Sequence, residues 1–109
     1  MSIVLRPNLA MTDAVLITTA ASVAVSRAVE EVSDQRPGIK WVNGVFVNEK
    51  KICGILTEAV SGFESGVVEC VVVGIGINVT DPGFPDELKQ VVGSLSGQCR
   101  DFSRNRLAA

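Results

Sequence analysis

Two lysines in one predicted hairpin are the residues of this chain best suited to chemistry. Lys40 and Lys51 lie in runs rich in Val, Ile, Phe and Trp, on either side of the polar residues 48–50. Such runs around a short polar segment predict a β-hairpin. A two-residue loop at 48–49 would place Phe46 opposite Lys51 and point both lysines to one side of the sheet, whereas a three-residue loop would separate them. Two ammonium groups on one largely apolar face would suit an anionic ligand. The alternative for each lysine is a solvated strand edge or a snorkelling side chain.

The strands expected around this turn span residues 39–47 and 51–58. Strict alternation along the second strand places Lys51 and Ile55 on one face and Gly54 on the opposite face. A third run, residues 67–73, is nearly continuous in β-branched residues, which predicts a strand buried on both faces.

A glycine pair follows that third strand. Gly74 and Gly76 precede Asn78, in a pattern close to the start of a dinucleotide-binding fingerprint. That fingerprint needs a third glycine and a following helix. Here the chain breaks at residues 81–83, which argues against a Rossmann site. Glycines in a strand indicate instead that another chain or a ligand comes close to the backbone.

The sequence predicts four further elements, of which the long helix is interpreted as scaffold only. We expect a strand at residues 2–6, a long helix at 13–32 with Thr12 as its N-cap, a helix from 85 to about 93, and a helix beginning near Arg106. The fold class predicted is α+β, with a mixed, largely antiparallel sheet of about five strands and helices packed on one side.

Composition excludes several classes of function. The chain has 109 residues, enough for one modest core, and a net charge of −2, which gives no support for nucleic-acid binding. It contains no histidine, so Ser-His-Asp and Cys-His catalysis and most zinc sites are excluded. Cys53, Cys70 and Cys99 are odd in number and lack C-x-x-C spacing, as expected of free thiols in a reducing cytoplasm. The sequence predicts no signal peptide and no membrane span.

Three motifs together carry a resemblance to a known family. KWVNG begins at Lys40, KICGIL begins eleven residues later at Lys51, and GIGIN begins at Gly74, twenty-three residues after that. The combination resembles the catalytic domain of biotin–protein ligases, whose patterns are KWPND, K-x-x-G-I-L-x-E and G-x-G-I-N-V. The resemblance covers essentially all of residues 1–109 and identifies them with the middle of that domain.

The resemblance implies an ATP- and Mg²⁺-dependent reaction in two steps. Biotin is activated to biotinyl-5′-AMP, and the biotinyl group is then transferred to a lysine of a biotin carboxyl carrier protein. Lys51 matches the family's catalytic lysine, which stands between two anions. The residues matched to biotin binding are Lys51, Gly54, Ile55, Gly74 and Gly76. Those matched to ATP or adenylate binding are Lys40, Asn43 and Asn78.

The departures from the family pattern define the alternatives. Gly44 replaces the aspartate of KWPND, which removes a carboxylate suited to a metal or nucleotide contact, and Val42 replaces its proline. The family's upstream glycine- and arginine-rich loop and downstream small β-domain have no counterpart here. We therefore expect a chain that does not ligate biotin at a useful rate alone, and whose exposed sheet edges pair in a homo-oligomer. A related lipoate ligase and a non-catalytic fragment are the other interpretations.

Overall fold

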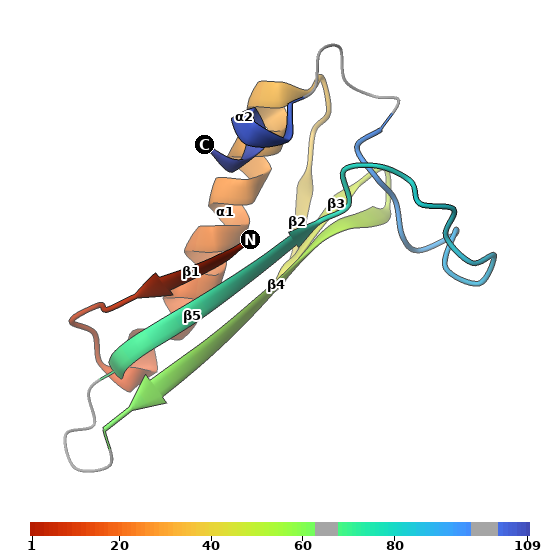
Figure 1. Ribbon diagram of the computed structural model, residues 1–109. Coiled ribbons are helices and arrows are strands. Elements are labelled where there is room, and N and C mark those ends of the chain that lie inside the picture. Colours follow the sequence, from red (N-terminus) through yellow and green to blue (C-terminus); the bar gives the residue numbers. More distant parts are fainter. Residues whose placement is uncertain (63–67, 97–102) are drawn as a thin grey trace.

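Five strands form one sheet, and helix α1 lies against one of its faces (Figure 1). The computed structural model describes residues 1–62, 68–96 and 103–109; Cys99 lies outside them. Its strands are β1 (Ser2–Leu5), β2 (Gly38–Lys40), β3 (Gly44–Val47), β4 (Lys50–Ser61) and β5 (Val68–Ile77), and its helices are the 3₁₀ helix η1 (Met11–Asp13), α1 (Val15–Val32) and α2 (Arg104–Ala108). The spatial order is β1-β5-β4-β3-β2, and each neighbouring pair is antiparallel. The predicted α+β class is confirmed, with an antiparallel sheet.

The core lies between α1 and the sheet. Val25 and Val29 of α1 are buried against Val45, Ile52 and Val71 from β3, β4 and β5. Burying each such side chain contributes roughly 1.5–3 kcal/mol. The core therefore lies on one face of the sheet, where α1 packs against β3, β4 and β5.

Polar contacts also tie α1 to strand β4 and to the turn between β2 and β3. Thr18 Oγ1 donates a hydrogen bond to Thr57 Oγ1 of β4 at 2.8 Å. The buried Ser22 Oγ lies 3.0 Å from the carbonyl oxygen of Thr18 and 3.1 Å from that of Val42. These contacts satisfy hydroxyls that would otherwise be costly to bury.

The turn between β3 and β4 has the predicted two-residue form. Asn48 and Glu49 have φ values of 49° and 65°, as a type I′ turn requires, and Phe46 pairs with Lys51. One β-bulge follows: Val45 pairs with Cys53, which leaves Ile52 as an extra residue in β4.

The bulge corrects one sequence-based expectation. Strict alternation placed Lys51 on the face of Ile55, but the extra residue brings Lys51 to the face of Gly54. A Cβ added to Gly54 would lie 3.7 Å from both Cε and Nζ of Lys51.

The predicted strand at 39–47 is also wrong. The chain reverses at residues 41–43, so β2 pairs with β3 and Lys40 lies opposite Gly44. Lys40, Gly44 and Phe46 nevertheless share a face, and Lys51 joins them by pairing with Phe46. Asn43 is a residue type that favours such a reversal.

Strand β5 differs from expectation in its burial and its length. Val71 and Val73 are buried, whereas Val72 is only half-buried and Gly76 is exposed, so one face of β5 is covered rather than two. The strand also continues through the glycine pair to Ile77.

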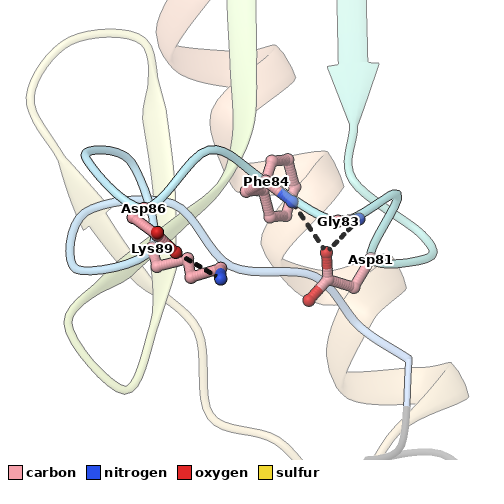
Figure 2. A network of polar contacts seen from close by, with 5 residues as sticks. All are labelled: Asp81, Gly83, Phe84, Asp86 and Lys89. Carbon is pink, nitrogen blue, oxygen red and sulfur yellow. Dashed lines mark hydrogen bonds and ion pairs between the residues drawn. The ribbon is translucent and has the colours of Figure 1, made fainter.

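The helix predicted from 85 to 93 is absent, and turns occupy its place. Asp81 Oδ1 accepts hydrogen bonds from the N–H groups of Gly83 and Phe84, and Lys89 pairs with Asp86 (Figure 2). Backbone bonds to β4 then determine the path: the N–H of Lys51 donates to the carbonyl of Val91 at 2.9 Å. These bonds outweigh the local helical preference of the segment.

The ends of the helices differ from expectation by a few residues. Thr12 lies in η1 and does not cap α1, which is preceded by Ala14 with no side-chain cap. The predicted helix near Arg106 is confirmed as α2. Strands β1 and β2 form the two edges of the described sheet, and their pairing in an oligomer stays a prediction. None of the helices in the described segments is long and apolar enough to cross a membrane.

The turn generates a stability prediction. Glu49 adopts a left-handed conformation that a Cβ disfavours, so Glu49→Gly should raise the free energy of unfolding by about 1 kcal/mol. Urea denaturation measures this change. Glu49→Ala is the matched control, since it removes the carboxylate but keeps the Cβ; an equal gain in both variants would contradict the turn geometry.

Candidate functional site

The face of the sheet opposite α1 carries a floor of glycines. Gly54 lies directly opposite Gly76 in the β4–β5 ladder, and Leu56 lies opposite Gly74. An added Cβ would meet its nearest atom at 3.7 Å for Gly54, 3.6 Å for Gly74 and 3.9 Å for Gly76, which are ordinary contact distances. The protein's own packing therefore does not require glycine at these positions. A ligand that lies against the bare backbone would require it.

Lys51 extends over this floor. Its Cε and Nζ approach the Gly54 backbone, and its side chain is half-buried. In the described part of the chain the only salt bridge joins Lys89 to Asp86, so the Lys51 ammonium has no carboxylate partner there. A cation held over an apolar floor without a counter-ion is suited to an anionic ligand group.

A cavity of about 520 Å³ contains most of the predicted site. Its lining includes six of the eight predicted residues, namely Asn43, Lys51, Gly54, Ile55, Gly74 and Gly76. Four further residues, Met1, Ser2, Leu56 and Ile75, also line it and were not predicted. Alternation from Gly54 could have identified Leu56, which is 63% exposed. Ser2 reaches the site through its pairing with Gly74, which no local pattern reveals.

The other two predicted residues lie outside this cavity. Asn78 Nδ2 donates to the carbonyl of Gly93 at 3.1 Å, and the Asn78 backbone bonds to Ile52 and Leu95. Its carboxamide thus holds the segment that follows β5 against β4. Lys40 is exposed, with its Nζ 5.8 Å from the centre of the Phe46 ring. The nucleotide roles of both residues stay predictions.

Comparison with known proteins identifies the family of this site. The profile of the Biotin/lipoate A/B protein ligase family matches residues 1–78, which include Lys51 and all three floor glycines. The chain belongs to this family.

Two curated relatives of this ligase-family chain are similar in sequence. The bifunctional ligase/repressor BirA of Bacillus subtilis (strain 168) is 43% identical over 98 residues, which is 88% of this chain and 30% of that protein. A biotin–[acetyl-CoA-carboxylase] ligase of Paracoccus denitrificans is 49% identical over 51 residues, which is 47% of this chain and 20% of that protein. The chain therefore spans less than a third of the length of either relative.

Solved structures of a biotin protein ligase from Aquifex aeolicus have the same fold. The apo structure matches with a TM-score of 0.79 and 28% identity over 98% of this chain and 45% of that chain. The structure described as a complex with biotin and ATP matches with a TM-score of 0.69 and 31% identity, over 98% of this chain and 43% of that chain.

The donor set does not fit the Mg²⁺ that the family reaction implies. No group of three or more Cys, Asp or Glu side chains within residues 1–62, 68–96 and 103–109 could hold a metal ion. The cavity lining, as far as the described residues form it, contains no carboxylate side chain. At Gly44, where the family pattern has aspartate, any Cβ would lie 2.8 Å from Phe46 Cε2. These residues therefore do not supply the oxygen ligands that Mg²⁺ prefers.

Cys53 lies beside Lys51 but points into the core. It is 1% exposed, and its thiol lies 3.6 Å from the carbonyl oxygen of Gly54. Burial raises the pKa of this thiol from 9.0 to about 11, and the positive charge of Lys51 offsets part of that rise. Cys53 is therefore a neutral thiol near neutral pH and packs as an apolar side chain.

This pKa shift predicts how stability changes with pH. The Cys53 thiol binds its proton more tightly in the folded chain, so its contribution is complete below about pH 9 and is lost as the pH rises toward 11. The free energy of unfolding, measured by urea denaturation at about pH 8 and about pH 10.5, should fall more in the wild type than in Cys53→Ala. Cys70→Ala is the control and should keep the wild-type fall. An equal fall in Cys53→Ala would show that the thiol is not shielded in this way.

Proposed function

We propose that the glycine face binds biotin and its adenylate, biotinyl-5′-AMP, as part of a biotin–protein ligase site. The observation that carries this proposal is the placement of the Lys51 ammonium over Gly54, inside a cavity that it shares with Asn43, Gly74 and Gly76. A flat ring system can lie on bare backbone where a Cβ would hold it away. The Lys51 ammonium, which has no carboxylate partner in the described part of the chain, then meets the carboxylate end of the ligand.

The positive charge of Lys51 is suited to the activating step, in which two anions react. A carboxylate oxygen of biotin attacks the α-phosphorus of ATP, a C–O–P bond forms, and pyrophosphate leaves. Two anions must approach each other, so a fixed cation between them lowers the cost of the encounter and stabilises the developing charge. In the transfer step, a lysine amine attacks the acyl carbon, an amide bond forms, and AMP leaves.

Family membership supports the choice of substrate. The Aquifex aeolicus relative has been solved in complexes described as containing biotin, and biotin with ATP, and its fold matches nearly all of this chain. On the same basis, the acceptor we propose is a lysine of a biotin carboxyl carrier protein. The family also includes lipoate ligases, so a lipoyl ligand is the alternative that an experiment must separate.

Among the described residues that line the cavity, Lys51 has the one cationic side chain. The activating step brings together a carboxylate and a triphosphate, whose charges one lysine does not balance. We therefore expect the 109-residue chain to bind the adenylate without ligating biotin at a useful rate.

An assay of the purified chain with ATP, biotin and a carrier protein tests this expectation. The predicted result is no biotinylated carrier above the level without the chain. Detectable biotinylation that depends on the chain would contradict it.

A thermal-shift titration tests the binding proposal. Biotinyl-5′-AMP should raise the melting temperature more than lipoyl-AMP, and AMP alone should have the smallest effect. Lys51→Ala should weaken the response by about tenfold in ligand concentration, the effect expected from losing one charge-assisted hydrogen bond.

Lys50→Ala is the matched control for charge and position. Lys50 precedes Lys51 in β4, but its Cβ faces Gly93 and its side chain lines a different cavity. This variant should keep the wild-type response. A flat response to all three compounds would leave the chain as a scaffold, and a preference for lipoyl-AMP would favour a lipoate ligase.

A further inference from the structure

We propose that Phe46 is a positioning residue that holds the Lys51 side chain over Gly54, and that Gly44 is glycine because this ring lies above it. The placement of Lys51 is a claim about the ligand-free protein. Its consequence for ligand binding rests on the proposed function.

The register of the hairpin brings Phe46 and Lys51 together. They are directly opposite each other in the β3–β4 ladder, and both project from the face that carries the glycine floor. Residues paired in this way have Cβ atoms about 4.5–5.5 Å apart, within reach of an aromatic ring and a lysine stem. The bulge at Ile52 begins at the next position of β4, so this pair is the last before the register shifts.

Gly44 shows where the ring lies. A Cβ at this buried position would be 2.8 Å from Phe46 Cε2 and 3.7 Å from Lys51 Cε. The ring and the lysine stem therefore both lie above the Gly44 backbone. Gly44 has no positive φ, so its conformation would accept alanine and only the ring excludes it.

These neighbours restrict the directions open to the Lys51 side chain. Phe46 Cε2 and Lys51 Cε both lie near the space above Gly44, and a Cβ built on Gly54 would lie 3.7 Å from both Cε and Nζ of Lys51. Ordering a free lysine on ligand binding costs side-chain entropy, and a stem already held by a ring avoids part of that cost. Lys40 also approaches this ring, because its Nζ lies 5.8 Å from the ring centre, within the range of a cation–π interaction.

The direct test is NMR of the lysine side chains in the ligand-free protein. In the wild type, the Hε protons of Lys51 should be shifted upfield by the ring and should show nuclear Overhauser effects to the Phe46 ring protons. Phe46→Leu should lose both signals, and Phe46→Tyr should retain them. The Hε protons of Lys50, on the opposite face, serve as the internal reference.

A second variant keeps the test valid if Phe46→Leu is unstable. Gly44→Ala should displace the ring and move the Lys51 Hε resonance, whereas in the Phe46→Leu background the same substitution should have little further effect. Such non-additivity is expected only if the two positions compete for one space.

Affinity for biotinyl-5′-AMP gives the functional part of the test. Phe46→Leu should bind about threefold more weakly, because it keeps the Lys51 ammonium and loses only part of the ordering of its side chain, and Phe46→Tyr should bind as the wild type does. An unchanged Lys51 resonance in Phe46→Leu, or an unchanged affinity despite an altered resonance, would overturn the proposal. If the wild type does not bind this ligand, the proposed function fails, and the resonances alone decide whether Phe46 positions Lys51.

Discussion

The β-bulge between β3 and β4 controls the direction of Lys51, and the candidate site depends on that direction. Without Ile52 as an extra residue, alternation would aim Lys51 at the face that α1 covers, where Val45 and Ile55 are buried. Burying an unpaired ammonium there would cost several kcal/mol. With the bulge, Ile52 enters the core and the cation lies on the open face. The extra residue thus allows Ile52 to pack in the core while Lys51, its neighbour in β4, lies on the open face.

The two faces of the sheet consequently differ in composition and in role. The face under α1 is filled by branched apolar side chains, and Val29 at 0% exposure shows how completely the helix closes it. The other face has no Cβ at Gly54, Gly74 or Gly76, although packing would permit one at each. Glycine weakens a strand, because it has no side chain to pack and loses more entropy on folding. Packing against α1 therefore stabilises strands β4 and β5, whose glycine residues would stabilise the sheet poorly by themselves.

The sequence predicted the elements and the motifs better than it predicted their connections. The polar turn at Asn48 is a local signal and was interpreted correctly. The ligand approach inferred from the glycines of β5 stays a prediction. The bulge at Ile52 was not predictable from alternation, because it appears only when two strands pair. The reversal within residues 41–43 and the absence of a helix at 85–93 have the same cause: backbone pairing with β3 and β4 overrides local preference. Asn78 matched the family motif, but only the structure shows that its carboxamide is bonded to Gly93.

Backbone amide NMR during a titration with biotinyl-5′-AMP tests the central claim most directly, because it reports where the ligand lies and not only whether it binds. The predicted result is a change in the amide signals of Gly54, Gly74 and Gly76, with the signals of Val25 and Val29 on the helix side unchanged. Changes confined to the helix side, or none at saturating ligand, would contradict the claim that the glycine face is the binding surface.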